Sequence, residues 1–270
     1  MYSGLRIVLL LGLLTAIFLG IGFFFAGMIG MTIGLVLSFA MSFVSYWFSD
    51  KFVIKLYGAK KSDSKDYKEL DKILQRLSEK TGIKKPSFYI MKTDIPNAFA
   101  TGRSPKHSAV AVTTGLMDKL SNDEIEGVLA HEISHIAHRD TLLNSMAATI
   151  GGAITWLGYM FYFGNEENRS ALSFVLLFIL APLAAMLVRM AISRNREYFA
   201  DHAGALLSKP TYLANALEKI HDAVKHNPAK GNPAAAHVFI VNPFSAGSVA
   251  GLFSTHPPMA ERVKRLREMR

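Results

Sequence analysis

Two histidines and a glutamate within GVLAHEISHIAHRD, residues 127–140, have the types and the spacing of a metal site. His131 and His135 are four residues apart, so on a helix their imidazoles lie on one face, one turn from each other. Two neutral imidazoles in that arrangement can bind one tetrahedral Zn²⁺. Glu132 lies between them, where a carboxylate can polarise a metal-bound water and accept its proton. The pattern predicts a metal centre able to hydrolyse its substrate.

The local sequence favours the helix that this spacing requires. Ser121 followed by Glu124 matches a capping box, in which each side chain hydrogen-bonds to the backbone of the other residue. Apolar residues then recur at helical spacing, at Ile125, Val128, Leu129 and Ile136. The alternative is a chance match of two ordinary histidines on a helix, and a third ligand would argue against it.

A candidate for the third ligand occurs in residues 193–202. Glu197 and Asp201 are again four residues apart and share a helical face. A glutamate as third ligand leaves the fourth zinc position open, which is the arrangement of catalytic rather than structural sites. Asp201 is suited to accept the second ring N–H of a ligating histidine. Alternatively, both carboxylates are solvated partners of Arg194 and Arg196.

Composition and hydropathy place the chain in a membrane. It has 270 residues, of which 50% are hydrophobic, and a mean hydropathy of +0.23. Residues 7–49 carry no charge, and this run is long enough for two spans of about 20 residues each. We predict these spans at Ile7–Ala26 and Met28–Phe48, with Gly27 and Gly30 at the turn. A cleaved signal peptide, with its single short apolar region, does not fit this run.

Two further uncharged stretches, 142–163 and 171–188, follow the metal-site helix and predict a third and a fourth span. They would form a hairpin that returns the chain to the side it left, so a ligand just past the fourth span can complete the site. Segments 51–140 and 193–270 are rich in Lys and Arg, whereas the short loops between spans are not. By the positive-inside rule, we expect both segments and both termini to face the cytoplasm.

The balance of charges indicates which class of partner the protein binds, and the lack of cysteine limits the residues that can bind a metal. The chain has 30 Lys and Arg against 21 Asp and Glu, a net charge of +9. We interpret this charge as a cytoplasmic face beside the anionic lipid of the bilayer. No basic patch with interleaved aromatic residues indicates a nucleic-acid partner. Because cysteine is absent, a zinc ion must be bound by His and carboxylate.

The cytoplasmic segments also predict the elements around the site. Three stretches have apolar residues at helical spacing: residues 65–80, residues 211–225 and the stretch from Met259. Residues 87–91 and 107–113 are apolar, β-prone runs, consistent with a small sheet beside the metal-site helix. An edge strand of that sheet could bind an extended substrate through its main chain, and a purely structural hairpin fits equally well.

Three remaining features of the sequence indicate a function less specifically than the motifs above. His138 shares the face of His131 but lies about 10 Å along the helix axis, too far to bind the same ion. Arg262 fits either a role in fixing a carboxylate near the site or a surface role. Residues 227–254, rich in Ala, Gly, Pro and Asn, are expected to form a loop near the cleft.

Four separated motifs together resemble the HtpX family. They are NAFATG at 97–102, HEISH at 131–135, RNREYFAD at 194–201 and FSTHPPMAERVKRL at 253–266. Members of this family are bacterial and archaeal membrane zinc endoproteases, related to the CaaX prenyl proteases of eukaryotes. The resemblance implies a cytoplasmic-facing gluzincin-type domain in the cell inner membrane. It also implies cleavage of misfolded or damaged membrane proteins in quality control, and self-cleavage.

The resemblance implies roles for the metal-site residues. His131, His135 and Glu197 would bind one Zn²⁺ per chain, and Glu132 would be the general base and acid. Asp201 matches the aspartate of a Glu-x-x-x-Asp pattern that supports a ligating histidine. We therefore expect zinc-dependent hydrolysis of peptide bonds.

Further residues match positions of the family that face the substrate. His256 matches a position proposed in relatives to stabilise the tetrahedral oxyanion. Asn97, Ala98 and Phe99 resemble the segment that aligns the substrate backbone.

These observations predict a mainly α integral membrane protein. Four transmembrane helices carry a cytoplasmic α+β gluzincin-like zinc protease domain with a small sheet. The expected division is two spans in 1–50, a catalytic part in 51–140, a transmembrane hairpin in 141–192 and a second catalytic part in 193–270. Because the metal-site helix runs directly into the third span, the site is expected close to the membrane plane.

Two other functions fit part of the pattern. One is a narrower protease that removes prenylated or other C-terminal tails, as the CaaX relatives do, although those relatives enclose their site with additional spans. The other is a membrane scaffold in which zinc is structural or absent. Glu132 argues against the scaffold because a structural site has no use for that carboxylate.

Overall fold

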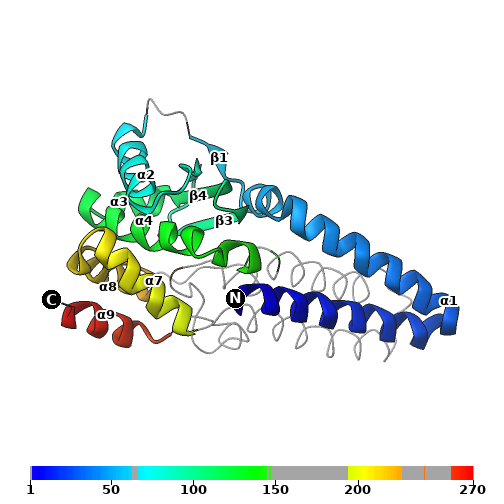
Figure 1. Cartoon of the computed structure of the whole chain (residues 1–270). Coiled ribbons are helices and arrows are strands. Elements are labelled where there is room, and N and C mark those ends of the chain that lie inside the picture. The colour runs from blue at the N-terminus through cyan, green and yellow to red at the C-terminus, as the bar shows by residue number, and fades with distance from the viewer. Residues whose placement is uncertain are drawn as a thin grey trace.

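The uncharged N-terminal residues form two helical segments that lie side by side. The structure is a computed structural model, and it describes residues 2–62, 66–144, 146, 194–226, 240 and 257–269. Helix α1, Tyr2–Leu56, is broken at Ala26 and Gly27, where Gly27 has a φ of 56° that residues with a side chain rarely adopt. The chain reverses at this break (Figure 1). The stretches Ile7–Phe24 and Ala26–Phe48 are each long and apolar enough to span a membrane, as predicted.

Glycines bring the two segments of α1 into close contact. A Cβ atom on Gly22 would lie 2.1 Å from the carbonyl oxygen of Gly30, and one on Gly34 would lie 2.3 Å from that of Phe18. Small residues allow such approach of helix backbones in a membrane. The structure therefore corrects the prediction for Gly30, which lies in this interface rather than at the turn.

The predicted third and fourth spans, 142–163 and 171–188, lie almost entirely outside the described residues. At the start of the third, Leu143 and Met146 are buried against Leu10 and Leu14 of α1. The chain that follows the metal-site helix thus packs directly on the first apolar segment.

Four strands form a small mixed sheet with the order β1-β2-β4-β3. They are β1 Lys60–Lys61, β2 Ser87–Met91, β3 Ala98–Ser104 and β4 His107–Thr113. Strands β2 and β4 coincide with the two predicted runs. They are parallel neighbours, and β4 instead forms a hairpin with β3, which the sequence pattern did not identify as a strand. Strand β3 lies at the edge of the sheet.

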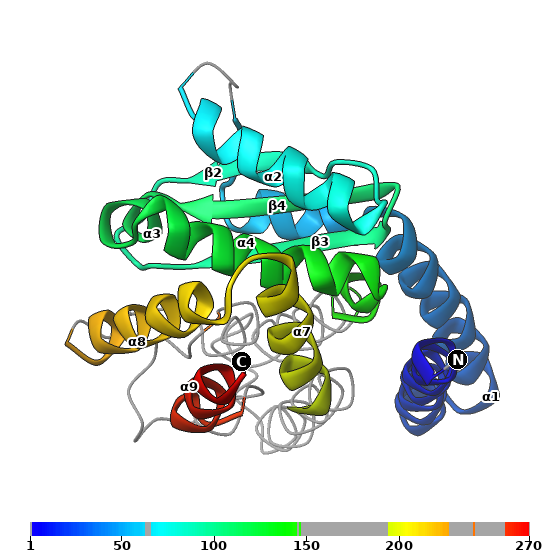
Figure 2. The same cartoon turned by 60° about the vertical axis from the view of Figure 1, so that its left-hand side comes forward.

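Further helices pack against this sheet or against one another (Figure 2). They are α2 Lys68–Thr81, α3 Thr114–Lys119, α4 Asn122–Ala137, α7 Arg194–Leu207, α8 Pro210–His226 and α9 Met259–Glu268. Helix α2 begins three residues later than predicted and ends at Gly82, which caps it in the left-handed conformation. Helices α4, α8 and α9 agree with the predicted positions.

Helix α4 is central because it contacts α2, β3, α7 and α8. Its N-terminus has the predicted capping box between Ser121 and Glu124. Two close approaches hold it against its neighbours. A Cβ atom on Gly127 would lie 2.5 Å from the amide nitrogen of Leu213 in α8, and one on Gly204 of α7 would lie 2.8 Å from that of His131. The absence of side chains at these glycines sets the positions of α8 and α7 against the metal-site helix.

Candidate metal centre

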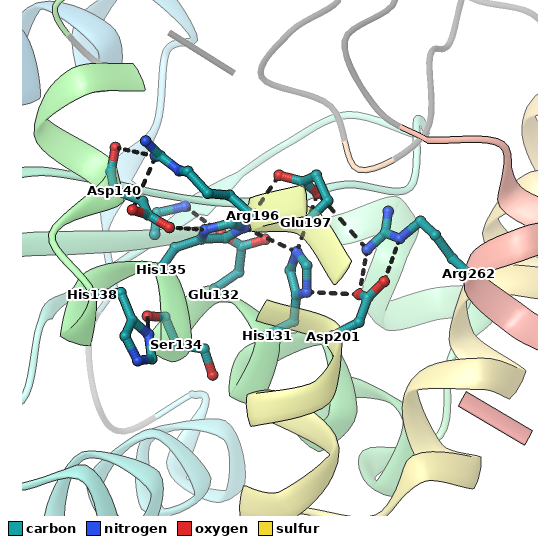
Figure 3. Close-up of polar contacts among 11 residues, drawn as sticks. His131, Glu132, Ser134, His135, His138, Asp140, Arg196, Glu197, Asp201 and Arg262 are labelled. Carbon is teal, nitrogen blue, oxygen red and sulfur yellow. Dashed lines mark hydrogen bonds and ion pairs between the residues drawn. The ribbon is translucent and has the colours of Figure 1, made fainter. Parts of the chain in front are cut away.

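Three buried side chains from α4 and α7 converge at one point (Figure 3). His131 and His135 come from consecutive turns of α4, and Glu197 comes from the first turn of α7. Their potential ligand atoms all lie within 4.8 Å of one another. The two Nε2 atoms are 3.2 Å apart. Oxygens of Glu197 lie 3.7 Å from Nε2 of His131 and 3.4 Å from Nε2 of His135.

The surroundings of the two imidazoles fit a bound cation. Nδ1 of His131 lies 3.0 Å from Oδ1 of Asp201, and Nδ1 of His135 lies 3.2 Å from Oδ2 of Asp140. When each Nδ1–H donates to its carboxylate, each Nε2 has a free lone pair. Two lone pairs and a carboxylate then face one another in a buried space, and they repel unless a cation lies between them. Two histidines and a glutamate are a common ligand set of catalytic zinc.

Glu132 lies beside this cluster and is fixed by the edge strand. Its Oε2 accepts a 2.8 Å hydrogen bond from the backbone N–H of Ala100 in β3. Burial raises the pKa of Glu132, although the neighbouring His131 and His135 act in the opposite direction. A carboxyl group with a raised pKa can accept and return a proton near neutral pH.

Arg262 of α9 holds Asp201 in place. Its Nε and Nη2 atoms donate to the two carboxylate oxygens at 2.8 and 2.7 Å, and its side chain is fully buried. Burial alone would raise the pKa of Asp201, but the charge and hydrogen bonds of Arg262 outweigh it and hold this pKa well below its usual range. Of the two interpretations of Arg262, the structure supports the one in which it fixes a carboxylate near the site.

The alternative in which Glu197 and Asp201 are solvated partners of Arg194 and Arg196 does not fit their burial. Each of the two acids is only 3% exposed. Nη2 of Arg196 lies 3.0 Å from Oδ1 of Asp140. Both acids thus belong to the buried cluster.

Sequence reasoning missed Asp140, the carboxylate that contacts His135. It lies beyond the end of α4, where helical periodicity no longer applies. Arg139, with a φ of 60°, turns the chain so that Asp140 lies back against the helix. Each histidine of the cluster therefore contacts an aspartate, and each aspartate contacts an arginine. The sequence signal for this contact was an acidic residue shortly after the second histidine. Such a signal is weak by itself.

We expect Asp140→Asn to weaken zinc binding by about 10- to 100-fold. Asparagine keeps the size of the side chain but loses the charge that raises the basicity of His135. Zinc affinity is measured by competition with a chelator of known affinity, and thermal unfolding of the metal-free protein is measured in parallel. The matched control is Asp222→Asn at the end of α8. An unchanged zinc affinity of Asp140→Asn would show that Asp140 does not act through His135.

The segment predicted to align substrate lies at the start of the edge strand. Ala98 and Phe99 are its first two residues, and both are buried. Asn97 precedes them, and its Oδ1 accepts a 3.0 Å hydrogen bond from the backbone N–H of Ile240. Asn97 therefore holds residue 240 beside the sheet, and its role toward a substrate stays a prediction.

Other predicted site residues lie elsewhere. His256 lies outside the described residues, as does the 227–254 loop except for Ile240. His138 does not join the cluster. Its Nδ1 lies 2.7 Å from the carbonyl oxygen of Ser134, and its ring packs edge-on against Phe199.

Comparison with known proteins shows extensive similarity to one family. Residues 64–270 match the sequence model of peptidase family M48. A Protease HtpX homolog from Pyrococcus furiosus is 48% identical over 271 residues, covering 97% of this chain and 94% of that protein. Homologs with the same name from a Sulfurihydrogenibium species and from Paraburkholderia phytofirmans are 47% and 44% identical. Each of these two matches covers all of this chain. The first covers 97% of the relative and the second covers 98%.

The fold also resembles a solved structure. The crystal structure of S. mikatae Ste24p matches with a TM-score of 0.51 and 19% sequence identity. The match covers 97% of this chain and 62% of the Ste24p chain. At this identity the similarity concerns the fold alone.

Proposed function

This chain belongs to peptidase family M48 and to the HtpX proteases within it, and on that basis we propose that it cleaves misfolded or damaged membrane proteins at the cytoplasmic face of the cell membrane. It is a membrane metalloprotease, and its substrates are peptides. The observation that carries the proposal is the convergence of His131, His135 and Glu197 beside the buried carboxylate of Glu132.

In this proposal, those three residues bind one zinc ion per chain. When bound, zinc lowers the pKa of water and polarises the scissile carbonyl group. Glu132 accepts the proton of the attacking water and delivers it to the leaving amine. The amide of Ala100 orients the carboxylate of Glu132 for both transfers. We assign Asp201 to the orientation of His131, and His256 to a hydrogen bond with the developing oxyanion.

We propose that β3 aligns the substrate. This strand is an edge strand of the sheet. The backbone N–H of Ala100 donates to Glu132 rather than to β4. An extended peptide that pairs with this edge, beginning at Asn97–Phe99, would lie beside the metal site. Main-chain pairing depends little on side chains, so it suits a protease of broad substrate range.

We also propose four spans, with both termini and both catalytic segments in the cytoplasm. Packing of Leu143 and Met146 on α1 supports a site close to the membrane plane, because α4 leads directly into these residues. The chain has no cysteine, so single cysteines can report orientation without background labelling. Lys72→Cys on the exposed side of α2 is expected to react with a membrane-impermeant maleimide only when the cytoplasmic side is accessible.

The proposal on substrates is tested in proteoliposomes. The protein is reconstituted with a membrane protein that exists in a stable form and in a form destabilised by a point mutation. We expect the destabilised form to be cleaved in its cytoplasmic loops and the stable form to persist, with no cleavage by Glu132→Gln. Equal cleavage of both forms would contradict quality control. Cleavage restricted to C-terminal tails would favour the narrower CaaX-type activity.

A further inference from the structure

A basic cavity lies where α1 meets the sheet, away from the metal site. Its volume is about 490 Å³, and its walls come from the end of α1, the chain before β2, the turn between β3 and β4, and the first residues of β2 and β4. The basic side chains around it are Lys51, Lys55, Lys84, Lys85, Lys106 and His107. We propose that this cavity binds the phosphate of an anionic lipid headgroup.

The charges of the cavity are largely unneutralised. Lys85 pairs with Asp71 at 2.6 Å, and Asp50 is the acid in the wall. The ammonium groups of Lys51, Lys55, Lys84 and Lys106 have no acidic partner within the part of the chain that the structure describes. The ammonium of Lys51 also lies 5.9 Å from the ring centroid of Phe48. Four ammonium groups without an acidic partner around one space therefore favour an anion.

The donors around this space are chemically suited to phosphate. Ser87 and Tyr89, which each carry a hydroxyl group, line the cavity together with the lysines. Ammonium and hydroxyl groups are both hydrogen-bond donors to phosphate oxygens. Ala109 contributes an apolar wall that an acyl or glycerol group can contact.

The position of the cavity along α1 points to a lipid as the source of the phosphate. The apolar span ends at Phe48, and the walls of the cavity include Lys51 and Lys55. At the helical rise, these residues lie about 5 and 10 Å beyond the end of the span. Headgroups occupy about 5 to 8 Å on each side of the hydrocarbon core, so Lys51 lies within this layer and Lys55 just beyond its outer edge. Basic pockets at this level bind the headgroups of anionic lipids in other membrane proteins.

A further cation, Arg103, lies at the same end of the span. The guanidinium of Arg103 lies 4.6 Å from the ring centroid of Trp47, and its Nη1 donates to the backbone oxygen of Trp47 at 3.4 Å. Tryptophan is typical of the interface between hydrocarbon and headgroups. The tip of the β3–β4 hairpin therefore approaches the bilayer beside the cavity.

A bound headgroup would join α1 to the catalytic part of the chain. The walls belong to α1, β2 and β4, and β4 pairs with β3, whose Ala100 orients Glu132. A ligand that bridges these elements stabilises the folded state because it binds only when they are assembled. The inference does not depend on zinc or on the role of Glu132.

The test is thermal unfolding of the full chain in nanodiscs. The discs contain either phosphatidylcholine alone or phosphatidylcholine with phosphatidylglycerol, and all proteins carry Glu132→Gln to prevent proteolysis. We expect the anionic lipid to raise the Tm by about 3 °C or more. The triple variant Lys51→Gln, Lys55→Gln, Lys106→Gln should lose most of this rise. Ser87→Trp, which fills part of the cavity without changing charge, should lose it as well.

The matched control changes three exposed lysines elsewhere, Lys72→Gln, Lys119→Gln and Lys264→Gln, and should keep the full rise. Each variant is compared with its own Tm in phosphatidylcholine, so a change in folding is separated from a change in binding. A full rise in Ser87→Trp would overturn the proposal, since attraction to the basic face alone would then suffice. An equal rise from millimolar inorganic phosphate in neutral discs would overturn the lipid as the source.

Discussion

Replacing Glu132 with glutamine is expected to reduce peptide hydrolysis by about 10³-fold or more and to leave the bound zinc unchanged. Glutamine has nearly the same shape, and its amide oxygen can still accept the hydrogen bond from Ala100. It cannot accept a proton from water at neutral pH, however. Hydrolysis of casein and zinc content are measured on the same detergent-purified samples.

The control for this variant is Glu126→Gln, which changes a glutamate on the same helix. Glu126 forms an ion pair with Arg76 away from the metal cluster, so its replacement should leave activity within about twofold of wild type. If Glu132→Gln retained wild-type activity, Glu132 would not be the base. If it lost zinc together with activity, the loss could not be assigned to proton transfer.

Replacing His135 with alanine is expected to remove both zinc and activity. The side chain supplies one of three ligand atoms within 4.8 Å of one another, and three protein ligands are the minimum of catalytic zinc sites. We expect zinc to fall below about 0.1 per chain after dialysis against buffer that leaves wild type loaded. The metal content is measured by atomic emission.

His138→Ala is the matched control because His138 follows one turn later at the end of the same helix. Its imidazole contacts Ser134 and Phe199 and not the cluster. We expect this variant to keep its zinc and its activity. Full zinc content in His135→Ala would show that the ion is held elsewhere.

Local patterns in the sequence were sufficient to predict the elements of the site. The periodic apolar residues and the capping box identified α4, and the spacing of four between Glu197 and Asp201 placed both on one face of α7. These features depend on interactions between residues close in the chain. For that reason they could be inferred before the fold was known.

Features that depend on distant contacts could not be predicted in this way. Strand β3 contains Gly102 and polar residues, and it is a strand because it pairs with β4 and donates to Glu132. Asp140 contacts Arg196, which lies 56 positions later in the chain. The contact between Asp201 and Arg262 joins residues 61 positions apart, and either residue alone is ordinary.

The most direct test of the metal centre is to remove the metal and restore it. Wild-type protein is treated with a chelator, dialysed and titrated with Zn²⁺, while zinc binding and hydrolysis of casein are followed together. We expect no activity without metal, and a return of activity in proportion to bound zinc that saturates at about one ion per chain. Full activity of the metal-free protein, or saturation with zinc without any return of activity, would contradict the proposed site.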